Sequence, residues 1–113
     1  MLDPVVLESL RQLTAPGEPD VLAQVCQLFL EDAPARIETL RRAQAAGEAV
    51  GVQRAAHSLK GSAGNLGAKA LLDVCRQLDD RARAGNLAGT ADLVASLDVE
   101  YARVEAEIAR LMA

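Results

Sequence analysis

The chain has 113 residues, which is enough for one domain with a substantial hydrophobic core. Half of its residues are hydrophobic, but it contains only one Phe, one Tyr and no Trp, so its core must be built from aliphatic side chains, as in helical bundles. The 12 Lys and Arg residues against 16 Asp and Glu residues give a net charge of −4, which argues against binding to nucleic acid or to an anionic membrane surface.

No apolar run approaches the length of a membrane span, and the N-terminus lacks a signal-peptide pattern. We therefore expect a cytoplasmic chain that forms one domain over residues 1–113 and does not insert into a membrane. The two cysteines, Cys26 and Cys75, each fall at or beside an apolar helical position, so we expect reduced, buried thiols. Two cysteines and one distant histidine do not make a metal site, and none is expected.

The N-terminal part of the chain predicts a short helix followed by a long one. Asp3 and the proline after it form a good helix start, and the proline- and glycine-containing stretch 14–19 is a linker. Asp20 is placed to cap a second helix that runs to about Ala46 and bends at Pro34, with two stacked segments as the alternative. Apolar residues at helical spacing in these two helices are Leu7, Leu10, Leu22, Val25, Phe29, Ala33, Ile37 and Leu40, with Val6 and Leu13 as weaker candidates.

The remainder predicts three more amphipathic helices joined by short turns. A turn at Gly47 leads into the third helix, a fourth runs from about Ala68 to Ala84, and the last begins near Leu87, with Asn86 as a candidate cap. Four long helices with short glycine turns predict an all-α fold, namely an antiparallel up-down four-helix bundle with a short additional N-terminal helix. The apolar positions of the last two helices are Leu71, Cys75, Leu78, Ala82, Leu87, Ala91, Val94, Leu97, Tyr101, Val104, Ile108 and Leu111.

The third helix holds His57, the only histidine of the chain. At about 100° per residue, five apolar residues fall within roughly 40° of one line, and His57 lies about 140° from the centre of that stripe. We therefore expect the imidazole to face water, in the same sector as Gln53, Lys60, Gly61 and Gly64. The residues of the buried stripe are Val52, Ala56, Leu59, Ala63 and Leu66.

The glycines of this helix need an explanation, because each interior glycine costs roughly 1 kcal/mol relative to alanine. Gly67 follows the last apolar residue and fits a left-handed C-cap. Gly61 and Gly64 lie off the apolar stripe, beside His57, which favours a surface kept bare so that a bulky partner can approach. The alternative is that they permit close packing between helices.

One exposed imidazole with bare backbone beside it suits a phosphoryl carrier. A neutral imidazole is a good nucleophile near neutral pH. The ammonium of Lys60, one turn further along the helix from His57, is within reach of an anion held on the ring. The bare glycines would let a second protein bring its own active site to the imidazole.

The run His57-Ser58-Leu59-Lys60-Gly61, with Gly64 and Leu66-Gly67 after it, resembles the motif of histidine-containing phosphotransfer (Hpt) domains. The resemblance implies that His57 is phosphorylated, that Lys60 steadies the phosphoryl group, and that Gly61 and Gly64 clear the docking surface. It also implies that the partner is a receiver domain of a response regulator or hybrid sensor kinase, which supplies both Mg²⁺ and the aspartate, so that the chain itself needs no cofactor.

Other residues are assigned to the site only through this resemblance. In some relatives a polar side chain from the next helix hydrogen-bonds the imidazole, and by position Asp79 or Arg83 would serve. The alternative is that these two residues and Asp80 form an ordinary exposed charge cluster. Lys69 has a similar pair of interpretations, at the rim of the docking face or as a solvated helix lysine, while Gln53, in the same sector as His57, is a candidate binding residue.

Two other functions fit parts of the pattern. The dimerisation domain of a sensor kinase also carries a helical histidine, but usually with a carboxylate next to it and a proline five residues on, where this chain has Ser58 and Ser62. That domain needs two chains to complete four helices, whereas this chain has enough helices as a monomer. The other alternative is an adaptor or inhibitor that docks a receiver or kinase without being phosphorylated.

The chain has no glycine-rich ATP-binding motif, so we expect no ATP-dependent kinase activity of its own. The sequence leaves the partner kinase and receivers, the direction of phosphoryl flow and the output pathway open. A free-standing carrier and a C-terminal domain of a membrane-bound hybrid kinase would look alike.

Overall fold

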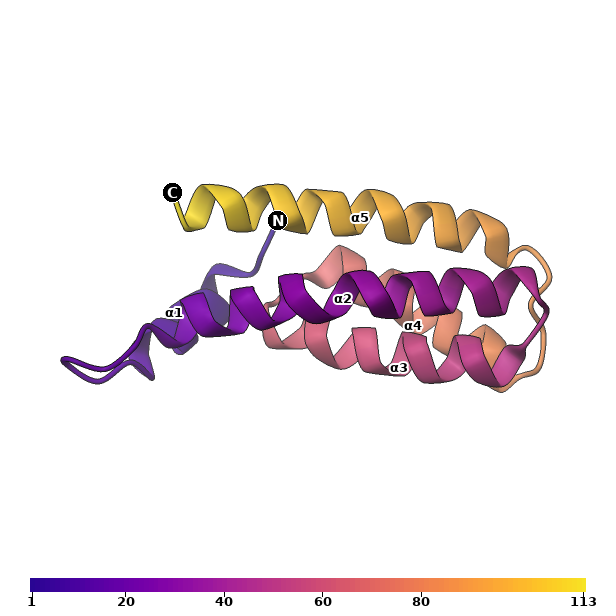
Figure 1. Ribbon diagram of the computed structural model, residues 1–113, viewed down its shortest axis with the longest axis horizontal. Coiled ribbons are helices and arrows are strands. Elements are labelled where there is room, and N and C mark those ends of the chain that lie inside the picture. The colour runs from indigo at the N-terminus through magenta and orange to yellow at the C-terminus, as the bar shows by residue number, and fades with distance from the viewer.

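The computed structural model describes all 113 residues and is built from five α-helices with no β-strand (Figure 1). The prediction of an all-α chain is therefore confirmed. The molecule is elongated, with extents of 49 × 22 × 20 Å. The helices are α1 (Pro4–Gln12), α2 (Val21–Ala45), α3 (Ala49–Asn65), α4 (Lys69–Arg83) and α5 (Thr90–Leu111).

Four of the helices lie side by side along the long dimension of the molecule (Figure 1). Helix α2 packs against α3 and α5, α3 packs against α4, and α4 packs against α5, so each of the four has two neighbours. Helix α1 packs against α2 at one end. None of the five helices combines the length and the apolarity that a membrane span requires.

The apolar stripe predicted for α3 lies in the core. All five of its residues have no exposed surface, and they belong to one cluster of 25 buried apolar residues drawn from every helix. The side of a helix opposite its buried stripe faces away from the core. The burial of these residues therefore determines which side of α3 faces water. The stripe comprises Val52, Ala56, Leu59, Ala63 and Leu66.

The predicted starts of the first two helices are confirmed in detail. The Asp3 carboxylate accepts a hydrogen bond from the Val5 N–H at 2.9 Å, and the Asp20 carboxylate accepts one from the Ala23 N–H at 3.3 Å. Pro34 lies inside one continuous α2, so the alternative of two stacked segments is wrong. Pro34 lies on the exposed side of this helix, where it removes one backbone N–H donor.

The start of the last helix was predicted three residues too early. Gly89 has a left-handed φ of +75°, which an α-helix cannot contain, so α5 begins only at Thr90. Asn86 does not cap α5; its side chain accepts a hydrogen bond from the Ala88 N–H within the preceding turn. Leu87 is consequently half-buried in that turn, and Ala91 is exposed rather than buried.

Gly67 sits where the chain turns from α3 into α4 and is glycine for two reasons. Its φ is +67°, as predicted for a left-handed C-cap. A Cβ at this position would also lie 2.7 Å from the Asp3 Cβ, because the N-terminal segment crosses here and the Asp3 N–H donates to the Gly67 carbonyl at 3.0 Å. The turn after the histidine helix is therefore anchored by the N-terminus.

Both cysteines are buried and unpaired, as predicted. Burial raises the pKa of the Cys75 thiol to about 12, although the charge of Lys60 acts in the opposite direction. Burial also raises the pKa of Cys26. Both residues therefore stay protonated near neutral pH and behave as small core side chains.

Candidate functional site

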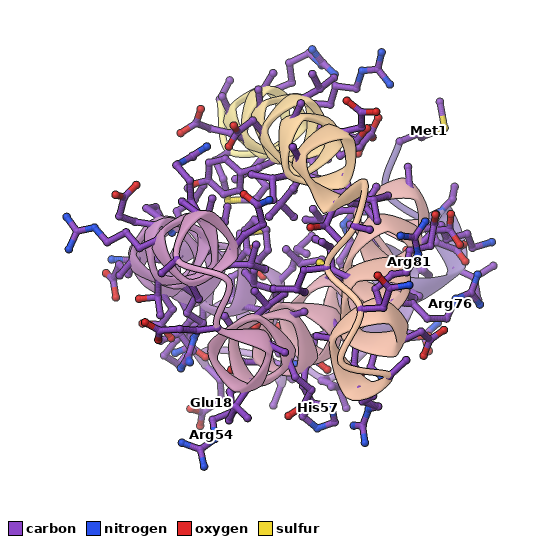
Figure 2. The ribbon with its side chains drawn as sticks, turned by 90° about the vertical axis from the view of Figure 1, so that its right-hand side faces the viewer. Met1, Glu18, Arg54, His57, Arg76 and Arg81 are labelled. Carbon is purple, nitrogen blue, oxygen red and sulfur yellow. The ribbon has the colours of Figure 1, made fainter.

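His57 projects from α3 into solvent. Its side chain is 61% exposed, and the view along the helices shows it at the outer edge of the molecule, pointing away from the other helices (Figure 2). Arg54, one turn earlier on α3, also points outward, whereas Arg76 and Arg81 lie on a different flank of the molecule (Figure 2). The predicted exposure of the imidazole is confirmed, and Arg54 is an outward-pointing cation on the same helix that the sequence analysis did not single out.

The two glycines that follow His57 leave the helix surface bare. A Cβ built on Gly61 or on Gly64 would meet no other atom within 4 Å, so neither glycine is needed for close packing. Gly51 in the same helix behaves in the opposite way, because its Cβ would lie 2.8 Å from the Ala43 Cβ of α2. The packing alternative is therefore wrong for Gly61 and Gly64, whereas Gly51, which the sequence analysis did not consider, lies in close contact with α2.

A buried carboxylate lies behind His57. Asp79 of α4 is only 1% exposed and is the one charged residue in the buried set. Its Oδ1 accepts hydrogen bonds from Arg83 Nε at 2.8 Å and Gln53 Nε2 at 3.2 Å, and its Oδ2 accepts one from Lys60 Nζ at 2.8 Å. The Nδ1 of His57 lies 3.7 Å from the same Oδ2, which is longer than a hydrogen bond.

The partners of Asp79 keep it ionised. Burial raises the pKa of this carboxyl group, but the hydrogen bonds from Lys60, Gln53 and Arg83, together with the charge of Lys60, outweigh it and bring the pKa down to about 2. A buried carboxylate is tolerated only when it is paired and hydrogen-bonded in this way. Asp79 therefore carries a full negative charge at neutral pH, within reach of the imidazole.

The interpretation of this region as an exposed charge cluster is wrong for Asp79. The residue lies four positions after Cys75 and three before Ala82, so it shares the inward sector of α4 and faces α3. Its neighbour Asp80 is exposed, as that interpretation expected. Arg83 remains largely exposed, with 56% of its side chain accessible while its Nε bonds to Asp79.

Most of the predicted site residues meet at one place, and one does not. The ammonium of Lys69, the first residue of α4, lies 3.2 Å from the Asp3 carboxylate, and its side chain is 76% exposed. Lys69 is therefore engaged with the N-terminal segment and makes no contact with the Asp79 cluster. The residues that the structure brings together around the imidazole are Gln53, His57, Lys60, Gly61, Gly64, Asp79 and Arg83.

An open groove runs beside the histidine helix on the side away from Asp79. It lies between α2 and α3, has a volume of about 550 Å³, and carries acidic groups from Glu31 and Asp32 and basic groups from Arg36 and Arg54. The α4 side of His57 is thus filled by the ionic cluster, while the α2 side is open.

A family model described as the Hpt domain matches residues 24–113 of the chain. The histidine-containing phosphotransfer proteins 2 and 5 of Arabidopsis thaliana are each 29% identical to it over 102 residues, which include 88% of the chain and 65% of each plant protein. The chain thus spans 65% of the length of these curated relatives. The crystal structure of histidine-containing phosphotransfer protein B (HptB) from Pseudomonas aeruginosa PAO1 matches with a TM-score of 0.86 and 32% identity, covering 96% of the chain and 91% of HptB. The chain belongs to the Hpt domain family.

Proposed function

We propose that this protein relays a phosphoryl group between receiver-domain aspartates through phosphorylated His57. The observation that carries the proposal is an exposed imidazole on a helix face kept bare by Gly61 and Gly64, with the Lys60 ammonium close to it. The names of the relatives, which describe histidine-containing phosphotransfer proteins, support the same reaction.

The transfer needs no proton movement. The lone pair of His57 Nε2 forms the N–P bond, the P–O bond to the donor aspartate breaks, and the aspartate carboxylate leaves with the electron pair. The ring keeps its proton on Nδ1, and the reverse step passes the phosphoryl group to a second aspartate. Such in-line transfer depends on positioning and charge neutralisation, so the receiver can contribute the aspartate and Mg²⁺ while this chain contributes the nucleophile.

Lys60 is proposed to stabilise the charge of the phosphoryl group, because it is the cation that lies near the imidazole one helical turn away. Asp79 is proposed to favour the tautomer with the proton on Nδ1, which leaves Nε2 free to attack. Gln53 and Arg83 act through Asp79, since both donate hydrogen bonds to its carboxylate. Lys69 would take part only at the rim of the docking face.

The scaffold is proposed to be an antiparallel up-down four-helix bundle formed by α2 to α5, which the ring of pairwise helix contacts and the short turns support. A single chain then completes the bundle, so we propose a monomer that works in the cytoplasm. It would act either as a free-standing carrier or as a domain of a hybrid sensor kinase.

A second candidate function uses the same docking surface but involves no phosphorylation of His57. The open groove between α2 and α3 would suit an adaptor that binds a receiver or sensor kinase and is never phosphorylated. The behaviour of His57→Gln separates the two, because an adaptor keeps its function in this variant and a carrier loses it.

The test is transfer from a radiolabelled phospho-receiver to the wild-type chain, to His57→Gln and to Arg103→Gln. Arg103 lies on α5, away from α3, so its variant is the matched surface control. We expect acid-labile, base-stable label on the wild type and the control and none on His57→Gln. Absence of label across a broad receiver panel, with binding still detectable, would favour the adaptor.

A further inference from the structure

One carboxylate oxygen of Asp79 faces two groups that can each donate a hydrogen bond to it. Lys60 Nζ is hydrogen-bonded to Oδ2 at 2.8 Å, and His57 Nδ1 stops 3.7 Å from the same atom. The other oxygen, Oδ1, already accepts from Arg83 and Gln53. Since a carboxylate has about four lone-pair sites, one remains for the imidazole, but the charge of Oδ2 is already compensated by an ammonium in contact with it.

We propose that Lys60 and the His57 Nδ1–H alternate as the principal partner of Asp79 Oδ2, and that phosphorylation of His57 exchanges them. In the resting protein Lys60 holds the oxygen. In the phosphorylated protein Lys60 moves to the phosphoryl oxygens and the Nδ1–H closes onto Oδ2. This inference rests on the proposed function and names the event that accompanies phosphoryl capture at the same site.

The charges favour the exchange in that direction. Formation of the Nε2–P bond places positive charge on the ring, whose proton stays on Nδ1, and brings a dianionic phosphoryl group to the opposite side of the imidazole. The carboxylate then attracts the ring more strongly than before, and the phosphoryl group attracts the ammonium. Lys60 is free to move, because its side chain is 31% exposed and has a flexible stem, whereas the buried Asp79 stays fixed by Arg83 and Gln53.

The exchange keeps Asp79 satisfied in both states. The carboxylate would otherwise lose one of its three hydrogen bonds when Lys60 leaves, and an undercompensated buried charge is costly. Arrival of the Nδ1–H restores the third bond. Asp79 is therefore a positioning residue whose hold on the imidazole is weak before phosphorylation and strong after it.

The resting half of the proposal is tested without any phosphoryl donor. The tautomer ratio of isotope-labelled His57 is measured from long-range proton–nitrogen correlation spectra, at a pH well above the ordinary imidazole pKa of about 6.5. Lys60→Met frees Oδ2 for the ring, so we expect the Nδ1–H fraction to rise at least about twofold over wild type, as gain of a charge-assisted hydrogen bond requires. Asp79→Asn should lower this fraction, and the exposed neighbour Asp80→Asn should leave it unchanged.

An unchanged tautomer ratio in Lys60→Met would overturn the proposal. This variant replaces a partly exposed residue and leaves Asp79 bonded to Arg83 and Gln53, so it keeps the test decisive even if Asp79→Asn unfolds the protein.

The phosphorylated half uses phosphoramidate, a small donor that needs no docking surface. His57 Nε2 attacks its phosphorus, and ammonia leaves with the electron pair of the P–N bond. We expect the Nδ1–H of the phosphorylated wild type, and that of phosphorylated Asp80→Asn, to exchange with solvent at least about threefold more slowly than the Nδ1–H of phosphorylated Asp79→Asn, because only a bonded N–H is protected. Equal exchange rates of the Nδ1–H in these proteins would refute the proposed exchange of partners at Asp79. Failure of the wild type to accept a phosphoryl group both from phosphoramidate and from the receiver panel would instead refute the proposed function, and the resting tautomer result would stand on its own.

Discussion

The absence of side chains at the two glycines beside His57 predicts that substitutions there will stabilise the protein. Gly61 and Gly64 have helical backbones, and a Cβ at either position meets nothing within 4 Å. Replacing both by alanine should therefore stabilise the protein by about 1 kcal/mol at each site. With an unfolding entropy of about 2.1 cal/mol/K per residue over 113 residues, the pair should raise Tm by about 8 °C.

Gly51→Ala is the matched control from the same helix. Its new Cβ would lie 2.8 Å from the Ala43 Cβ, so the change forces α2 and α3 apart and should destabilise the protein by about 1–3 kcal/mol. Thermal and urea unfolding followed by circular dichroism measure all of these variants. If the alanines at 61 and 64 destabilised the protein as Gly51→Ala does, the two glycines would be packing residues, and the reasoning from a bare docking surface would be refuted.

The functional half of this prediction uses a larger side chain at Gly61. Gly61→Gln should fold normally, because the space around it is open, yet slow phosphoryl transfer from a receiver domain by blocking its approach. Phosphoramidate is small, so labelling of His57 by phosphoramidate should proceed at the wild-type rate in the same variant. Normal transfer from the receiver would show that the glycines do not clear a docking surface.

Three further predictions follow from the ion pairs. Lys60→Ala should slow transfer or shorten the phosphohistidine lifetime, measured by loss of radiolabel, with Arg103→Ala as the surface control. The pKa of Asp79 is lowered to about 2 from 3.8, so its ionised form stabilises the folded state by about 2 kcal/mol. This contribution is complete above about pH 4 and is lost as the pH falls towards 2. The difference in unfolding free energy between wild type and Asp79→Asn, measured in urea titrations, should therefore shrink over that range. Arg41 makes two hydrogen bonds of 2.8 Å to Asp98 and links α2 to α5, but both side chains are over two-fifths exposed. Arg41→Gln should therefore lower the unfolding free energy by less than about 1 kcal/mol in the same titrations. A larger decrease would mean that this pair is shielded from water.

The helices and the exposed histidine were predictable because they depend on local periodicity. Five apolar residues at steps of three and four determine which sector of α3 is buried, and the positions of His57, Gly61 and Gly64 follow from that sector without any knowledge of the other helices. Helix starts at Asp3 and Asp20 were equally local, since one side chain caps one backbone turn.

The start of α5 and the burial of Asp79 were not predictable in this way. Leu87 continues the helical spacing of apolar residues, and only the left-handed backbone at Gly89 moves the helix start to Thr90. Asp79 is buried because three partners from two helices meet there, and the sequence shows a charged residue without showing those partners. Its spacing from Cys75 and Ala82 was the available signal, but a charged residue at an inward position is usually assigned to the surface.

The position of the ionic cluster argues that it serves the imidazole rather than the fold. A well-packed apolar side chain at position 79 would stabilise the contact between α3 and α4 as well as a buried ion pair does, or better, because it requires no desolvation of charge. The core elsewhere follows that rule, since its other buried members are apolar apart from Gly67 and Thr90. The one charged member, Asp79, has its Oδ2 3.7 Å from Nδ1 of the only histidine, and the same oxygen accepts a hydrogen bond from Lys60. Because an apolar side chain could replace this charge in the fold, its place next to the exposed imidazole is best explained by control of the tautomer of His57 and of the Lys60 ammonium beside it.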